Sequence, residues 1–299
     1  MFLNWLGALP GAAAQGMIWG IMAIGVYLTY KILDVADLTV DGSICTGGAV
    51  CAILVTNGVN VWLALLIALI AGMLSGFVTG ILHTFMGIPA ILAGILTQLM
   101  LWSVNLKIMG KANVALPSRK YDLILAQIDT VKSILVLIAA VVLLIAFLYW
   151  FFGTELGASI RATGNNLNMS RAQGINTDFT KILGLTLSNG IVALSGALLA
   201  QYQGFADVSM GRGAIVIGLA AVIIGEAVIS KISQNLAVRL IGVIVGGVIY
   251  YFVYQTVIFL GLDADLLKML SAIVVAVFLA VPYWKKKYFT KAKGGQKHA

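Results

Sequence analysis

The side chains that could carry out catalysis are scarce in this sequence. His83 and His298 are the only histidines among 299 residues, one near the end of an apolar run and the other in a basic tail. A histidine metal site or a histidine-based catalytic triad needs such groups gathered together, so both are excluded. No stretch reads G-x-x-x-x-G-K followed by Ser or Thr, the pattern of a phosphate-binding loop. The sequence therefore predicts a protein that is not an enzyme and has no cofactor or metal of its own.

Ionisable side chains are equally rare inside the apolar runs. Glu226 lies late in one such run with Lys231 five residues on, which favours an interfacial ion pair over a proton relay. Asp34, Asp37 and Asp41 fall at a predicted helix boundary, where solvated or helix-capping aspartates are ordinary. Transporters driven by protons or sodium usually keep ionisable groups at mid-membrane. Their scarcity indicates that another subunit supplies the energy if this chain moves a solute.

The composition sets the class of protein that must position these groups. Hydrophobic residues make up 61% of the chain and charged residues 10%, against roughly 25% charged in an average soluble domain. Thirty-three glycines and four prolines fit closely packed transmembrane helices, where small residues let backbones approach. The two cysteines, Cys45 and Cys51, share one apolar stretch and are predicted to be small buried residues. We expect an all-α fold, a polytopic transmembrane helical bundle.

Apolar runs predict about nine spans, within a range of eight to ten, since a spanning helix needs roughly 20 apolar residues. Two runs, Ser43 to Thr56 and Ala214 to Ile229, are flanked by glycine and too short for ordinary spans. We expect these two to be short broken or partly re-entrant helices. The long runs cover residues 11–33, 62–86, 88–109, 132–153, 178–203, 236–260 and 265–284.

Similar segments precede the two short runs, ADLTV at residues 36–40 and ADVSM at residues 206–210. Five spans separate the two copies, and an odd number gives the halves opposite orientations, as in an inverted internal repeat. We expect a single transmembrane domain followed by a basic tail. Its predicted parts are domain 1–284, repeat halves at about 11–109 and 178–284, connecting span 132–153, loop 154–177 and tail 285–299.

Basic residues in short loops predict the orientation, because such residues favour the cytoplasmic side. Six lysines between residues 285 and 297 place the C-terminus in the cytoplasm, in a solvated tail that explains the net charge of +8 without a nucleic-acid partner. Counting back puts the segment 110–131 outside, although it holds three basic residues. The chain is thus predicted to be a multi-pass protein of the cell (inner or plasma) membrane. The loops near 154–177 and 231–239 are predicted to be cytoplasmic, in agreement with Arg161, Arg171, Lys231 and Arg239.

The longest predicted cytoplasmic loop, residues 155–176, is patterned rather than random. Small and polar residues alternate with Leu156, Ile160, Leu167 and Met169. This pattern indicates short interfacial helices, broken at Gly164 and closed at Gly174.

Motifs in this loop carry a specific resemblance. Residues 161–166 (RATGNN) and 172–176 (AQGIN) resemble the coupling loop of ABC permeases of the branched-chain amino acid and ribose importer family. Residues 37–40 (DLTV) resemble a further element of that family, except that Asp41 intervenes before Gly42, which suggests a subfamily. Residues 87–90 (GIPA) and 108–113 (IMGKAN) are most similar to permeases for aromatic or related amino acids. The resemblance covers residues 11 to 284.

The resemblance implies the membrane-spanning permease subunit of an ATP-driven importer for a small solute, an amino acid by its nearest likeness. The implied partners are two ABC ATPase subunits, which bind the ATP and magnesium, a second permease copy in a homodimer, membrane lipid and an extracytoplasmic solute-binding protein. The coupling loop of such permeases sits in a groove of the ATPase. The implied contact residues are Arg161, Ala162, Gly164, Asn165, Asn166 and Gly174.

Two further groups of residues are candidates for function. Basic residues on the predicted outer face suit acidic patches of a binding protein, although a solvated charged loop explains them equally well. These are Lys111, Arg119, Lys120 and Arg212. Polar residues in the apolar runs are candidates for the substrate path or, alternatively, interhelical hydrogen bonds. They are Thr46, Gln98, Asn105, Asn189 and Gln201.

Glycines spaced four apart mark predicted helix contacts, at Gly72, Gly76 and Gly80 and again at Gly242 and Gly246. An ion-coupled secondary transporter with inverted repeats is the main alternative function. A channel or a purely structural membrane subunit is a third.

Overall fold

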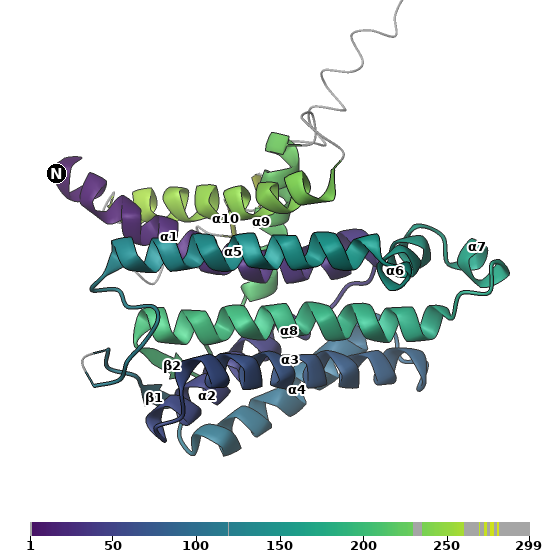
Figure 1. The fold of residues 1–299 in the computed structure, drawn as a ribbon, viewed down its shortest axis with the longest axis horizontal. Helices are drawn as coiled ribbons and strands as arrows, with labels where there is room; N and C mark the ends of the chain where they lie inside the picture. The colour runs from purple at the N-terminus through teal and green to yellow at the C-terminus, as the bar shows by residue number, and fades with distance from the viewer. Residues whose placement is uncertain are drawn as a thin grey trace, which may run out of the picture.

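The computed structural model describes residues 2–118, 120–229 and 235–259, together with six separate positions between 269 and 280. Its long helices lie roughly side by side, with a small strand pair at one end and two short helices at the other (Figure 1). The elements in chain order are α1 (Phe2–Tyr27), the π-helix η1 (Leu28–Ile32), α2 (Val40–Thr56), α3 (Val61–Thr84), α4 (Ala90–Met109), β1 (Asn113–Ala115), α5 (Thr130–Gly153), α6 (Glu155–Asn165), α7 (Leu167–Ala172), α8 (Thr177–Gln203), β2 (Phe205–Asp207), α9 (Ala214–Ile229) and α10 (Leu236–Phe259).

Six helices in the described part of the chain are long and apolar enough to cross a membrane. They confirm six of the seven long predicted runs, and the helical membrane bundle with them. The seventh run, 265–284, lies mostly outside the described residues. The two short runs are also helices, α2 and α9.

Burial separates central helices from peripheral ones. In the most apolar stretch of α5, 11% of the residues are buried, whereas in that of α8 the buried share is 72%. Leu143 on α5 is 71% exposed and Trp150 is 66% exposed. Large apolar side chains exposed along a whole helix are stable only against lipid or another protein, so α5 lies at the periphery.

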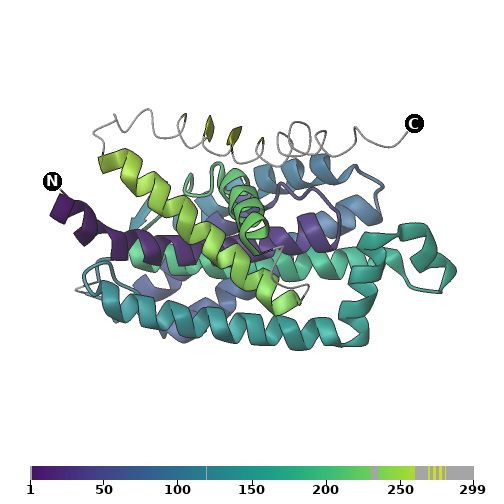
Figure 2. The same cartoon turned by 90° about the horizontal axis from the view of Figure 1, so that it is seen from above.

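The packing pattern has two matching halves. The short helix α2 packs against α3 and α8, and the short helix α9 packs against α10 and α1. Seen from above, α10 crosses obliquely over α1, with α9 beside it (Figure 2). Each short helix therefore packs against one long helix from its own end of the chain and one from the opposite end.

The predicted glycine contacts are confirmed. A Cβ atom at Gly72 or Gly76 would overlap a backbone carbonyl of α8, and one at Gly80 would lie 3.0 Å from the Ile182 Cα. Gly242 and Gly246 face the backbone of α9 in the same way. Small residues thus let these helices approach until their backbones are in contact.

The strand pair was not predicted. β1 and β2 are antiparallel, with Asn113 opposite Asp207 and Ala115 opposite Phe205. Three-residue strands carry no periodicity that a sequence can reveal. The pair ties the segment after α4 to the segment before α9.

The two short helices meet at their N-termini. Asp41, in the first turn of α2, accepts hydrogen bonds from the N–H groups of Gly213 (3.0 Å) and Ile215 (2.9 Å), where α9 begins. The prediction of a capping aspartate is right for Asp41, but the capped helix is the distant α9. A carboxylate at a helix N-terminus is stabilised by the unpaired N–H groups and the helix dipole.

Both cysteines are free and buried, as predicted. The Cys45 Sγ accepts from the Gly211 N–H at 3.1 Å.

The predictions about the acidic residues have different outcomes. Glu226 pairs with Lys31 of η1 at 3.3 Å, whereas the predicted partner Lys231 lies outside the described residues. Both side chains of the pair are partly exposed, as an interfacial pair requires. Asp34 is exposed, as expected, but Asp37 is buried at 3% exposure rather than solvated. Only the tertiary fold brings Lys31 and the core residues to these carboxylates.

Candidate functional site

The α6–α7 segment is firmly attached to the bundle. The Arg161 Nη2 donates to the Phe152 carbonyl at 2.7 Å, in the last turn of α5. The hydroxyls of Thr163 and Thr180 are 2.9 Å apart, which joins α6 to α8. A Cβ at Gly164 would overlap the carbonyl of Ile32, so this glycine allows α6 to lie directly against η1. A displacement of α6 would therefore move α5, α8 and η1.

The break between the short helices lies two residues later than predicted. α6 continues through Gly164 and ends at Asn165. Asn166 has an extended backbone, and its side chain accepts from the Met169 N–H at 3.0 Å, which caps α7. Closure at Gly174 is confirmed, since Gly174 has a φ of +80° just after α7. The asparagine N-cap of α7 therefore marks the break, and Gly164 stays within α6.

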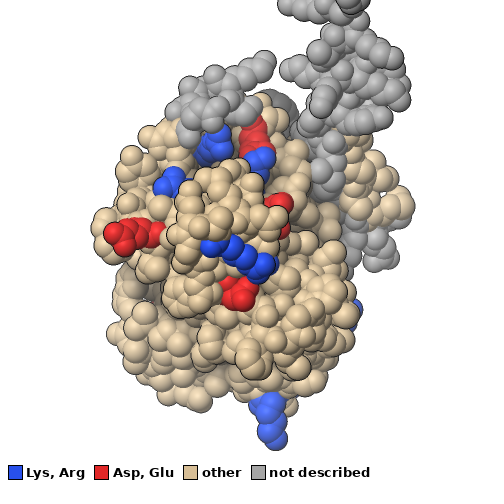
Figure 3. Space-filling model, turned by 90° about the vertical axis from the view of Figure 1, so that its right-hand side faces the viewer, with Lys and Arg blue, Asp and Glu red and all other residues tan. Residues whose placement is uncertain are grey.

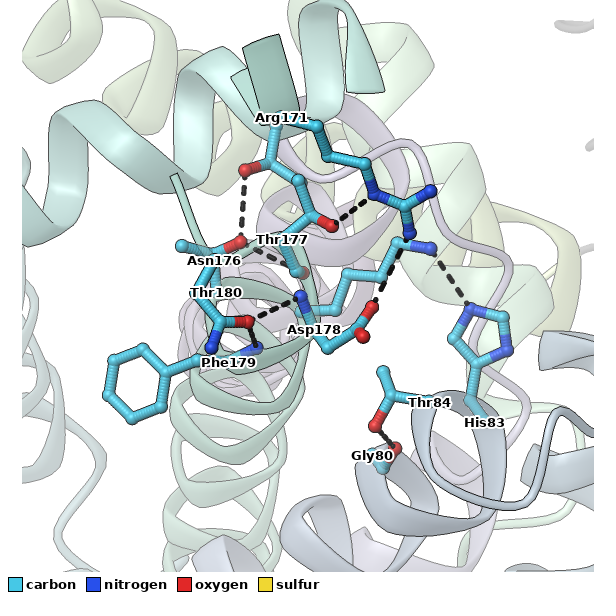
Figure 4. Close-up of polar contacts among 11 residues, drawn as sticks. Gly80, His83, Thr84, Arg171, Asn176, Thr177, Asp178, Phe179 and Thr180 are labelled. Carbon is cyan, nitrogen blue, oxygen red and sulfur yellow. Dashed lines mark hydrogen bonds and ion pairs between the residues drawn. The ribbon is translucent and has the colours of Figure 1, made fainter. Parts of the chain in front are cut away.

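Hydrogen bonds and an ion pair fix the corner between α7 and α8 (Figure 4). The Arg171 Nε donates to the Thr177 Oγ1 at 2.9 Å, and an Arg171 Nη2 lies 3.6 Å from the Asp178 Oδ1. The Lys181 Nζ lies 3.4 Å from the His83 Nε2, which connects α8 to the end of α3. Figure 3 looks onto this end of the molecule, where basic and acidic side chains lie close together.

A wide polar cavity of about 620 Å³ lies between α6, η1 and the first residues of α10. Three predicted ATPase-contact residues, Arg161, Gly164 and Asn165, line it together with Lys31 and Arg239. The other three are Ala162, half-buried on α6, Asn166 at the break, and Gly174 after α7. The fold thus gathers all six at one end of the bundle.

A buried polar network lies where α2 begins. The Asn189 Nδ2 donates to the Asp37 Oδ2 at 2.7 Å, and the Thr39 N–H donates to the Asp37 Oδ1 at 2.8 Å. The Ser43 hydroxyl donates to the Asn189 Oδ1 at 2.6 Å. The Ser43 and Ser75 hydroxyls are 2.7 Å apart, which extends the network to α3. We call these residues, Asp37, Thr39, Ser43, Ser75 and Asn189, the polar core.

Three of the five predicted path residues are buried in protein contacts. Asn189 belongs to the polar core and is fully buried. The Thr46 hydroxyl donates to the carbonyl of Gly42 in its own helix at 3.0 Å. Gln201 accepts from the Ile124 N–H at 3.2 Å and is also fully buried. Asn189 and Gln201 thus bond to other segments, as the alternative interpretation expects, whereas the Thr46 hydroxyl bonds within its own helix.

The other two path residues line a separate cavity of about 310 Å³, which we call the crossover cavity. Gln98 and Asn105 reach it from α4, Asp41 from α2, and Arg212 from the turn before α9. The Arg212 guanidinium carbon lies 4.9 Å from the centre of the Trp102 ring, a cation–π contact. Sequence patterns did not single out Trp102, because an isolated aromatic in an apolar run has no distinguishing signal.

The predicted docking residues do not share one place. Arg212 lines the crossover cavity, whereas Lys120 lines another cavity of about 720 Å³ with Trp62 and Lys132. Lys111 is exposed beside β1. Arg119 lies outside the described residues.

An acidic residue adjoins these basic ones. Partial burial alone would raise the pKa of Asp207, but hydrogen bonds from the Ser209 hydroxyl and N–H and from Asn113 lower this pKa below its ordinary value. Asp207 is therefore ionised at neutral pH.

Comparison with known proteins gives a consistent result. Residues 9–281 match the model of a family described as the permease component of branched-chain amino acid transport systems. A tyrosine transport system permease protein of Clostridioides difficile is 42% identical over 269 residues, 89% of this chain and 88% of the relative. An uncharacterized protein of Rickettsia prowazekii is 33% identical over 90% of this chain and 95% of its own.

A more distant relative is a permease for a different solute. An autoinducer 2 import system permease protein of Yersinia pseudotuberculosis is 32% identical over 93% of this chain and 72% of its own length. No solved structure matches.

Proposed function

Because the chain belongs to the family of permease components of branched-chain amino acid transport systems, we propose that it forms the membrane path of an ATP-driven importer for an amino acid. Membership makes it a multi-pass membrane protein and a non-catalytic transport subunit. The amino-acid solute is proposed by analogy with the 42% identical tyrosine permease, in preference to the solute of the more distant autoinducer 2 permease.

The observation that carries the proposal is the α6–α7 segment. Its inner side is bonded to α5 and α8 and packs directly against η1. Its outer side presents apolar residues among the charged groups at this end of the molecule, since Leu156 is 47% exposed and Met169 is 55% exposed. A groove on an ATPase subunit would cover these two side chains. Closing of the nucleotide-bound ATPase dimer would then shift α6 and, through its bonds, the spanning helices.

The partners follow from this arrangement. We assign two ATPase subunits that bind ATP and magnesium, a second copy of this permease and an extracytoplasmic solute-binding protein. The end with α6 and α7 then faces the cytoplasm, together with the C-terminus, and the β1–β2 end faces outward. The basic residues of the predicted cytoplasmic loops support this orientation.

The domain organisation that we propose is one permease domain made of two inverted repeats. In each copy an aspartate accepts from an N–H two residues on, Asp37 from Thr39 at 2.8 Å and Asp207 from Ser209 at 2.7 Å. The repeat is also supported by packing, because α2 and α9 each contact one long helix from their own half and one from the other half.

A test of the ATPase contact uses charge on the exposed apolar residues. Changing Leu156 and Met169 together to glutamate should reduce co-purification of the ATPase with the tagged full-length chain at least tenfold. Each buried apolar side chain contributes about 1.5–3 kcal/mol, and about 1.4 kcal/mol is a factor of ten. Ile128→Glu, a 70% exposed residue just before α5 and at the opposite end of the bundle, is the matched control and should retain the ATPase. Equal recovery with the double variant would reject the contact.

Docking of the binding protein has its own test. Reversing Lys111, Arg119 and Lys120 to glutamate should slow association roughly tenfold at low ionic strength, because complementary charges steer encounter. The difference should shrink at high salt, where the Debye length is about 3 Å at 1 M. Surface plasmon resonance over a salt series measures it. Arg171→Glu, at the opposite end, should dock normally, and unchanged association of the triple variant at low salt would contradict the assignment.

One observation favours the secondary-transporter alternative. Asp37 is a buried carboxylate within the bundle, and no described residue forms an ion pair with it. Such groups act as proton relays in ion-driven transporters. An Asp37→Asn variant that still gives a folded monodisperse peak separates the two functions, since it should keep ATP-driven uptake but would abolish uptake powered by a proton relay.

A further inference from the structure

The crossover cavity contains groups that the coupling machinery does not use. Its volume of about 310 Å³ lies at the lower end of ligand pockets, roughly 300–1,000 Å³. It lies beside the junction where Asp41 of α2 holds the N-terminus of α9. Broken helices that meet within a bundle are where transporters commonly place solute and ion sites.

The first pointer to a ligand is an unpaired amide. Asn105 is 1% exposed, and its Oδ1 has no hydrogen-bond partner among the described residues. A buried polar atom without a partner is unfavourable, so native structures rarely keep one without a reason. Rotation of the amide exchanges its oxygen and nitrogen. Asn105 can therefore offer either an acceptor or a donor to a molecule in the cavity.

The second pointer is the pair of opposite charges that line the cavity. Arg212 makes no ion pair with a described residue and lies over the Trp102 ring. Its guanidinium matches the planar geometry of a carboxylate. The Asp41 carboxylate and the oxygens of Gln98 and Asn105 are acceptors that suit an ammonium group. A molecule that carries a carboxylate and an ammonium on one carbon fits this distribution better than an uncharged sugar does.

We propose that the crossover cavity is a translocation subsite for a zwitterionic α-amino acid. Arg212 holds the carboxylate of the solute, and Asn105 and Gln98 accept from its ammonium group near Asp41. Trp102, which is 37% exposed, packs against the solute side chain. The inference rests on the proposed function and names the place where the path recognises its solute. It also gives Arg212 a role inside the path in place of docking.

Thiol protection tests the subsite in the full-length chain. Leu99 lines the cavity and is 63% exposed, whereas its neighbour Met100 is 46% exposed and does not line it. Leu99→Cys and Met100→Cys are made separately and treated with a charged methanethiosulfonate in nanodiscs. Both variants also carry Cys45→Ser, because Cys45, although buried, lines the same cavity, and the serine hydroxyl keeps an acceptor for the Gly211 N–H. Cys51 is buried away from the cavity, so the Cys45→Ser protein gives the background.

L-Tyrosine at ten times its half-protecting concentration should slow modification of Leu99→Cys about tenfold by mass action, with no effect on Met100→Cys. L-Leucine tests whether the side chain matters. Tyramine, which lacks the carboxylate, and D-ribose should protect weakly or not at all. In Leu99→Cys protein that also carries Arg212→Gln, the half-protecting concentration of L-tyrosine should rise about tenfold, since a hydrogen bond to a charged group is lost.

The subsite would be overturned if the charged reagent failed to modify Leu99→Cys, or if neither amino acid protected it. Equal protection by D-ribose, or an unchanged half-protecting concentration in Arg212→Gln, would overturn it as well. ATPase co-purification is measured on the same samples. If the ATPase is retained while protection fails, the subsite is wrong and the proposed function stands. Loss of both would reject the proposed function as well.

Discussion

Replacing Gly164 by alanine is expected to lower ATP-driven uptake at least tenfold while the protein remains folded in the membrane. The added Cβ would overlap the carbonyl of Ile32, so α6 must move away from η1. Overpacking of this kind costs about 1–3 kcal/mol, and a shift of α6 would also strain the bond from Arg161 to the Phe152 carbonyl. The change should therefore separate the ATPase contact from the helices that it drives.

The matched control for this change is Gly153→Ala. Gly153 is also helical, but a Cβ there meets nothing within 4 Å. Intrinsic helix propensity favours alanine over glycine by about 1 kcal/mol at both positions, so only the contact with Ile32 differs. Uptake and uncoupled ATP hydrolysis are measured in proteoliposomes. Full uptake by Gly164→Ala would show that close packing of α6 on η1 is not needed for coupling.

Replacing Asp37 by leucine is expected to destabilise the fold by about 2–4 kcal/mol. The change leaves the Asn189 Nδ2 and the Thr39 N–H without their acceptor. Each buried group left unpaired costs about 1–3 kcal/mol, although interhelical hydrogen bonds in membranes average about 0.6 kcal/mol. Thermal unfolding in nanodiscs, followed by the loss of a folded monodisperse peak, measures the effect.

Asp207→Leu is the control for the aspartate turn itself. Asp207 makes the same bond to the N–H two residues on, but it is only half-buried, and its own amide donor, Asn113, is exposed and 3.4 Å away, against 2.7 Å for Asn189 and Asp37. Surface changes of this kind usually alter stability by less than about 0.5 kcal/mol. Equal losses for the two variants would mean that the turn, rather than the polar core, stabilises the start of α2.

The spanning helices could be predicted from the sequence because their apolar length is a local property. The starts and ends of α3, α4, α5 and α8 lie within two residues of the predicted runs. The short helices α2 and α9 were recognised by the same rule, since glycines bound their apolar runs. Asn166 was missed as the end of α6 because Gly164 is the stronger local breaker, although here it serves packing.

The site depends on contacts that no local pattern reveals. Asp41 lies in α2 but caps the start of α9. Gly213, whose N–H it accepts there, is 172 residues away in sequence. Asp37 looks like a solvated boundary residue until α8 brings Asn189 to it. Trp102 gains its partner only when the turn before α9 places Arg212 over it. These pairings are set by tertiary packing, which an isolated sequence does not specify.

The source of energy for transport is the central claim, and one uptake measurement tests it most directly. The tagged full-length chain is purified with its ATPase, reconstituted into proteoliposomes, and supplied with the binding protein and labelled L-tyrosine. We predict uptake that requires ATP on the side of the membrane where the ATPase lies. This uptake should stop with Gly164→Ala, and collapsing the proton and sodium gradients should not affect it. Uptake by the chain alone, driven by an ion gradient without ATPase or binding protein, would contradict the account.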